Sequence, residues 1–312
     1  MKGAELPEQP AHKNLDMLGI VKKEFPGLIV EALTIGKYKN DSSLNEDGCV
    51  VTENTFAVID GSAPRTDIQF EGKSSARFAT DVVKNVLLTT DPSINGRELV
   101  SAITSELNKQ IDKIGMRNIV QETKEAFPAA LFTAARIVGD TVIITALGDV
   151  GCRVNGNVIH TETFASEDAM IEKRISAMKG AQEQNQSLSD EELLQIGKRA
   201  IVEDLNYQVK NYFNNPDSDL GLGIINGGYV PDKFIKKYTF KLKDIKTLEL
   251  FSDGYFVLPA APEIATWEEA FFAGEKEDPL RWNKYPAVKS ATKDMFSDDR
   301  TIVIVKRITS LV

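Results

Sequence analysis

Apolar positions along the chain fall into short runs that are typical of β-strands. Many of these runs are bounded by Gly, Asn or Asp, as in VGDT and VNGN. Such close boundaries favour antiparallel hairpins over parallel crossovers. The predicted strands cover residues 28–36, 48–52, 55–60, 129–138, 141–149, 234–242, 246–253 and 301–306.

A helical period of apolar positions replaces this pattern in three places. Residues 74–88 predict a first amphipathic helix. Asn95 with Glu98 predicts a capping box that begins a second, and Ser189 with Glu192 predicts another.

The order of the elements predicts an α+β fold in which helices pack outside antiparallel sheets. We expect residues 1–27 to form an N-terminal tail and residues 28–312 to form a single domain. The charged segment at about 166–215 is interpreted as a helical insertion in that domain, with an ordinary pair of solvated helices as the alternative.

Composition narrows the class of protein. The net charge is −9, which disfavours binding to nucleic acid or to an anionic membrane. The chain has no apolar run of about 18 residues and begins with a polar segment, so we expect a cytoplasmic protein with no membrane span. With two cysteines and two histidines, any catalytic metal is expected to have oxygen ligands.

Carboxylates recur where predicted strands begin or end. Glu46 and Asp47 precede one strand, Asp60-Gly61 and Asp253-Gly254 each end one, and Asp298 leads into the last. Each motif alone is also compatible with a turn. If the strand ends meet, their like charges require a counter-charge, which a divalent cation supplies.

The ordered motifs NED, FAVIDGS, LGDVGCR, LFSDG and SDDRTIVIV resemble those of the metal-dependent protein phosphatases, the PPM or type 2C family, in its compact bacterial branch. The resemblance spans residues 45–306 and implies a β-sandwich of two antiparallel sheets flanked by helices. It also implies two Mn²⁺ or Mg²⁺ ions, with the catalytic carboxylates Asp60, Asp253 and Asp298 among their ligands. Asp60 would bridge both ions.

The resemblance assigns further ligands. The Gly61 carbonyl would join the second metal with Glu46 or Asp47, directly or through water. Asp149 in LGDVGCR would reach a third metal, or is simply a turn residue.

The expected activity is hydrolysis of phosphoserine and phosphothreonine in proteins, through a water activated by two metals. The alternative is a pseudophosphatase that keeps the sandwich as a binding or regulatory module. The oligomeric state, the substrate and the preferred metal are left open.

One position departs from the family. Ser42 stands where many members carry an Arg that binds the substrate phosphate. Lys39, Arg65 or Arg300 is expected to replace it, unless the metals alone hold the phosphate or these residues are ordinary surface charges.

Overall fold

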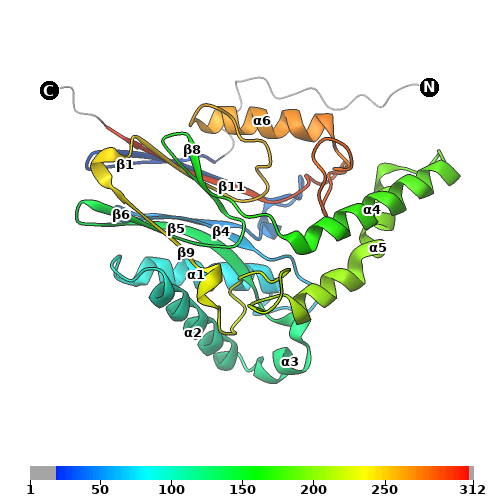
Figure 1. Cartoon of the computed structure of the whole chain (residues 1–312), viewed down its shortest axis with the longest axis horizontal. Helices are drawn as coiled ribbons and strands as arrows, with labels where there is room; N and C mark the ends of the chain where they lie inside the picture. Colours follow the sequence, from blue (N-terminus) through cyan, green and yellow to red (C-terminus); the bar gives the residue numbers. More distant parts are fainter. Residues whose placement is uncertain (1–18, 309–312) are drawn as a thin grey trace.

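Two antiparallel sheets lie face to face in the computed structural model, which describes residues 19–308 (Figure 1). The first sheet has the order β1-β2-β11-β10-β7-β8 and the second has the order β3-β4-β5-β6-β9. Every paired neighbour is antiparallel, which confirms the predicted α+β sandwich.

The strands of the two sheets have the following bounds. Those of the first sheet are β1 Val21–Phe25, β2 Leu28–Ile35, β7 Gly151–Val154, β8 Asn157–His160, β10 Thr247–Phe251 and β11 Arg300–Arg307. Those of the second are β3 Gly48–Val51, β4 Thr55–Gly61, β5 Ala130–Val138, β6 Thr141–Leu147 and β9 Lys236–Lys241.

Alternation along β4 shows how the layers are built. Phe56 and Val58 belong to the cluster between the sheets, while Ala57 and Ile59 belong to the cluster under the helices. Because successive strand residues point to opposite faces, a strand that is buried on both sides reads as a continuous apolar run. This explains why FAVI carries no polar position.

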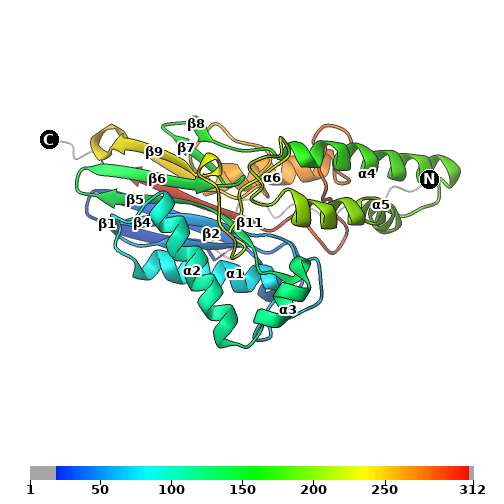
Figure 2. The same ribbon diagram turned by 60° about the horizontal axis from the view of Figure 1, so that its bottom comes forward.

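The helices cover both outer faces of the sandwich. They are α1 Ser75–Thr89, α2 Arg97–Lys113, α3 Arg117–Glu122, α4 Ala165–Gln184, α5 Asp190–Asn211 and α6 Ile264–Glu277. Helices α1 and α2 pack on the second sheet and α6 packs on the first. Helices α4 and α5 form a hairpin that projects beyond one end of the sandwich (Figure 2). No helix within residues 19–308 is long and apolar enough to cross a membrane.

Several predicted boundaries differ from the structure. The predicted tail overlaps β1, which pairs with β2, while residues 1–18 lie outside the described residues. Helix α6 was not predicted, because Glu268 and Glu275 are buried among its apolar positions and mask the amphipathic pattern. The segment at 166–215 is helical, as predicted, and its status as an insertion stays a prediction.

The two predicted capping boxes had opposite outcomes. The box of Ser189 and Glu192 is formed and confirms the start of α5. The box of Asn95 and Glu98 is wrong, because α2 begins after Gly96, whose φ is 57° and whose N–H donates to Thr145 Oγ1 at 2.8 Å. The Asn95 amide instead donates to the Pro92 carbonyl.

His160 fixes the turn that carries one of the candidate carboxylates. The side chain is buried, its Nε2 lies 2.8 Å from the Gly148 carbonyl and its Nδ1 lies 3.3 Å from the Tyr238 hydroxyl. Gly148 has φ 85° and abuts Leu131, so only glycine fits there. The buried imidazole therefore holds the backbone next to Asp149.

We predict that His160 makes folding sensitive to acid. Burial lowers the pKa of His160 in the folded protein below its usual value of 6.5. The unfolded chain therefore binds a proton that the folded protein does not, and stability falls as the pH drops through about 6.5. We expect the free energy of unfolding of His160→Gln to depend less on pH between about pH 7.5 and about pH 5.5 than that of the wild type. Carboxylates titrate in both proteins, so an equal pH dependence in urea unfolding would refute this role.

Candidate active site

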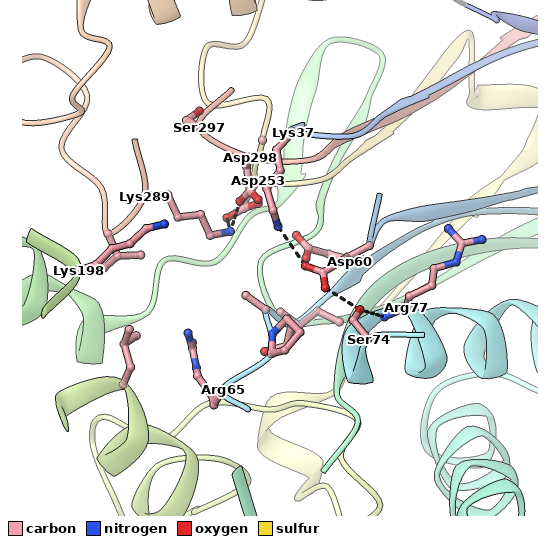
Figure 3. Close-up of a pocket in the computed structure, with 18 of the residues that line it drawn as sticks. Lys37, Asp60, Arg65, Ser74, Arg77, Lys198, Asp253, Lys289, Ser297 and Asp298 are labelled. Atoms are coloured by element: carbon pink, nitrogen blue, oxygen red, sulfur yellow. Dashed lines mark hydrogen bonds and ion pairs between the residues drawn. The ribbon is translucent and has the colours of Figure 1, made fainter. Parts of the chain in front are cut away.

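A cavity of about 990 Å³ lies at the edge of the sandwich where several strands end (Figure 3). One wall consists of the loop after β4 and the opposite wall of α5 and the loop that leads to β11. Asp60, Asp149, Asp253 and Asp298 all line it.

Strand pairing brings three of these carboxylates together. Phe251 is the register partner of Ile302, so the end of β10 and the start of β11 meet at one edge of the first sheet. Asp253 and Asp298 lie just beyond that edge, where both pair with Lys289, and the charge of Asp253 is among those that raise the pKa of Asp60 of β4. The strand ends thus deliver the three predicted catalytic carboxylates to one place.

The glycines of the two Asp-Gly motifs permit close backbone approach. A Cβ on Gly61 would lie 2.6 Å from the Glu46 carbonyl oxygen, and one on Gly254 would lie 2.0 Å from the Asp299 carbonyl oxygen. Neither distance is compatible with a side chain. In both motifs the glycine therefore lets one carboxylate-bearing segment pack directly on another.

Glu46 and Asp47 have different surroundings. Glu46 accepts hydrogen bonds from Ser74 Oγ at 2.7 Å and from Lys37 Nζ at 3.0 Å. Asp47 accepts one from Ser252 Oγ at 2.7 Å and is one of the charges that raise the pKa of Asp60. Asp47 is thus the member of the pair with an electrostatic effect on Asp60.

The site is crowded with negative charge. Burial and then the neighbouring carboxylates raise the pKa values of Asp47, Asp60 and Asp149 well above their usual range. Burial also raises the pKa of Asp298, to about 7, against the opposing charge of Lys289. For Asp253 burial acts in the same direction, but the charge and the hydrogen bond of Lys289 help to outweigh it and the pKa is lowered.

Two lysines that the sequence interpretation missed partly neutralise this charge. Lys37 Nζ lies 3.0 Å from Glu46 and 3.2 Å from Asp299 Oδ2, and Lys289 Nζ is paired with Asp253 and Asp298. Lys37 stands two residues beyond β2, so the rule that drew attention to carboxylates at strand ends could have found it. Lys289 lies in an irregular loop and has no comparable signal in the sequence.

Only one of the three predicted phosphate ligands faces the cavity. Arg65 lines it, makes no hydrogen bond or ion pair with any of the described residues, and has a buried Nε without a partner. Lys39 instead donates to the carbonyls of Thr292 and Lys293. Arg300 is buried, pairs with both oxygens of Glu268 and stacks on Phe271. The predictions for Lys39 and Arg300 are therefore corrected.

The carboxylates of the cavity suit a divalent cation by their chemistry, although they do not form a preformed metal site. Within residues 19–308 no three His, Cys, Asp or Glu side chains are arranged as a preformed metal site, and the ammonium of Lys289 lies between two of the candidate ligands. The chemistry nevertheless fits a hard cation, because Asp149 Oδ1 and Asp253 Oδ1 are buried without a hydrogen-bond partner. Lys37 and Lys289 also pair with only four of the seven carboxylates gathered in this part of the described chain. The seven are Glu46, Asp47, Asp60, Asp149, Asp253, Asp298 and Asp299.

Comparisons with known proteins gave matches only among solved structures. No protein-family model and no curated protein matches the chain. The catalytic domain of the serine/threonine protein phosphatase PstP in complex with two manganese ions is 11% identical, with 90% of this chain and 100% of that chain covered and a TM-score of 0.47. Serine-threonine phosphatase 2C from Toxoplasma gondii is 12% identical, with 93% and 98% covered and a TM-score of 0.46. Serine/threonine phosphatase Stp1 from Staphylococcus aureus is 14% identical, with 90% and 95% covered and a TM-score of 0.46. At such low identities and TM-scores the similarity alone does not carry a function over to this chain. The function is therefore inferred from the side chains of its own cavity.

Arg300 and Arg65 allow the effect on stability to be compared between an arginine in a buried ion pair and an arginine without one. We expect Arg300→Met to lower the free energy of unfolding by about 3 kcal/mol, because it leaves Glu268 buried and unpaired. Arg65→Met breaks no ion pair and should change stability by less than about 1 kcal/mol. Urea unfolding measures both, and similar losses in the two variants would contradict the assignment.

Proposed function

We propose that this chain is a metal-dependent phosphomonoesterase of the PPM (type 2C) type that removes phosphate from phosphoserine and phosphothreonine in proteins. The observation that carries the proposal is the convergence of Asp60, Asp253 and Asp298 in a cavity that also receives the unpaired Arg65. Hard oxygen donors beside a free guanidinium suit a phosphate ester bound together with divalent cations.

The residues have distinct roles in this proposal. Asp60 would bridge two Mn²⁺ or Mg²⁺ ions, Asp253 and Asp298 would complete the first ion, and the Gly61 carbonyl would serve the second with Glu46 or Asp47. Asp149 is a candidate ligand for a third. When bound, two such ions would lower the pKa of a shared water and neutralise charge on the phosphate oxygens.

The chain's own side chains would then bind and orient the substrate. The Arg65 guanidinium offers planar, paired donors that match two phosphate oxygens. Lys198 of α5 also lines the cavity, is exposed and makes no hydrogen bond or ion pair within residues 19–308. Both cations are therefore available to an anionic substrate.

The two cysteines, His160 and Ser74 are poorly placed to form a covalent phosphoenzyme. Neither Cys49 nor Cys152 lines the cavity, and His160 is occupied by Gly148 and Tyr238. The hydroxyl of Ser74, which does line the cavity, donates to Glu46. Attack by water is therefore the proposed route.

The net charge bears on the substrate class. A net charge of −9 disfavours nucleic acid as a partner, so a phosphorylated protein is proposed as the substrate. A cytoplasmic location is also proposed, in keeping with the two free cysteines Cys49 and Cys152.

The second candidate is an inactive member of the same fold that binds partners. The specific observation in its favour is Lys289, whose ammonium occupies the space between Asp253 and Asp298. Stabilisation by Mn²⁺ separates the two candidates, since a cation that binds only the folded protein raises its melting temperature.

Loss of a metal-binding carboxylate should strongly reduce activity. With Mn²⁺ or Mg²⁺ at neutral pH, we expect Asp60→Asn and Asp253→Asn to lower kcat for p-nitrophenyl phosphate and a phosphothreonine peptide by about 100-fold or more. Both should also lose the rise in melting temperature on adding Mn²⁺. Asp244→Asn is the control, because Asp244 is exposed and lies just before the start of β10, whereas Asp253 follows the end of that strand. Turnover by Asp60→Asn at the wild-type rate would refute the site.

Removal of the Arg65 guanidinium should weaken substrate binding. We expect Arg65→Met to raise KM for the phosphothreonine peptide by about tenfold, because a charge-assisted contact to phosphate is lost. Arg199→Met is the matched control, since Arg199 is exposed on α5 and does not line the cavity. Steady-state kinetics decide the matter, and an unchanged KM would mean that the phosphate is held without Arg65.

A further inference from the structure

Lys289 lies at the centre of the carboxylates that are proposed to bind metal. Its Nζ is 3.3 Å from Asp253 Oδ2 and is also paired with Asp298 Oδ2, as Figure 3 shows. Asp60 is near enough to attract it as well. One ammonium group is therefore paired with two of the three carboxylates on which the proposed activity depends.

The loop that carries Lys289 is anchored on both sides of it by one arginine. Arg174 of α4 is fully buried and donates to the Ala287 carbonyl at 3.0 Å and to Ser290 Oγ at 2.7 Å. It also donates to the Leu280 carbonyl at 3.1 Å. Because these bonds hold the loop on both sides of Lys289, the entropy lost when its side chain pairs with the carboxylates is mainly that of the side chain.

The lysine and a divalent cation compete for the same oxygens. Asp253 Oδ2 and Asp298 Oδ2 already face the ammonium, and a metal ion bound by both would lie close to a like charge. The side chain of Lys289 is 37% exposed and lines the cavity, so it has room to withdraw into solvent. Withdrawal breaks two ion pairs, and the free energy lost with them reduces the net free energy of binding the cation.

We propose that Lys289 is a built-in competitor for the divalent cation, which lowers the affinity of the Asp253–Asp298 pair for metal and leaves when the metal binds. The inference rests on the proposed function in that the same carboxylates serve as metal ligands. In the absence of metal, Lys289 keeps them partly neutralised. The site fills only when the concentration of cation is high enough to displace it.

The decisive experiment compares the binding of Mn²⁺ alone to Lys289→Met and wild type by isothermal titration calorimetry at neutral pH. We expect the variant to bind about tenfold more tightly or better, since the competing charge is gone. Lys289→Arg keeps the charge and should stay near the wild-type affinity. Lys284→Met is the matched control, because Lys284 lies in the same loop but pairs with Glu277 at the surface. Unchanged or weaker binding by Lys289→Met would overturn the proposal.

A measurement on the wild-type protein covers the case in which Lys289→Met does not fold. Acetylation of individual lysines by a low concentration of acetic anhydride is followed by mass spectrometry, with and without Mn²⁺. We expect labelling of Lys289 to rise several-fold when Mn²⁺ is added, as its ion pairs are broken, while labelling of Lys284 stays constant. Equal or lower labelling of Lys289 with Mn²⁺ would refute displacement.

These readouts separate the inference from the proposed activity. Tighter binding of Mn²⁺ by Lys289→Met without hydrolysis of any phosphoester would support the role of Lys289 as a competitor and refute the proposed phosphatase activity. Metal-dependent hydrolysis by wild type with unchanged binding in the variant would do the reverse. If neither protein binds Mn²⁺, both ideas fail.

Discussion

The rest of this structure depends on one electrostatic constraint, the crowding of seven carboxylates at one edge of a β-sandwich. Like charges at such distances repel one another strongly, and burial adds the loss of hydration. Backbone hydrogen bonds of β4, β10 and β11 hold three of the charges in place, and Gly61 and Gly254 let the segments approach. The sandwich thus supplies the rigidity that keeps mutually repelling groups together, a property typical of functional sites rather than of stable cores.

Buried arginines elsewhere in the fold have hydrogen-bond or ion-pair partners inside the protein. Arg136 donates to the carbonyls of Leu87, Asp91 and Ile94, and Arg153 pairs with Glu249. Each of these guanidinium groups has partners inside the protein, as stability requires. Arg65 has no such partner in the described part of the chain, and its Nε is buried. The difference in partners, rather than burial alone, separates an arginine that holds the fold together from one that is available to a ligand.

The apolar pattern predicts the antiparallel strands well because the central strands are buried on both faces and read as continuous apolar runs, whereas the sandwich was implied by the family resemblance. The motifs at strand ends also indicate where Asp60, Asp253 and Asp298 lie, since the position of Asp60 is fixed by the strand that precedes it. Elements whose pattern is set by tertiary partners could not be predicted. Helix α6 buries Glu268 against Arg300, and β1 is largely exposed and gains its order from pairing with β2. Lys289 lies in a loop, where no period restricts its position.

The position of Lys289 also connects distant parts of the chain. Arg174 reaches from the α4–α5 hairpin to the loop that holds the lysine, so the hairpin and the carboxylates share one chain of contacts. A change in the packing of the hairpin would therefore move the ammonium, and with it the charge balance among Asp60, Asp253 and Asp298. The hairpin also contributes Lys198 and Ile201 to the wall of the cavity. A protein bound at that wall would thus lie against the same hairpin that, through Arg174, positions the counter-charge of the site.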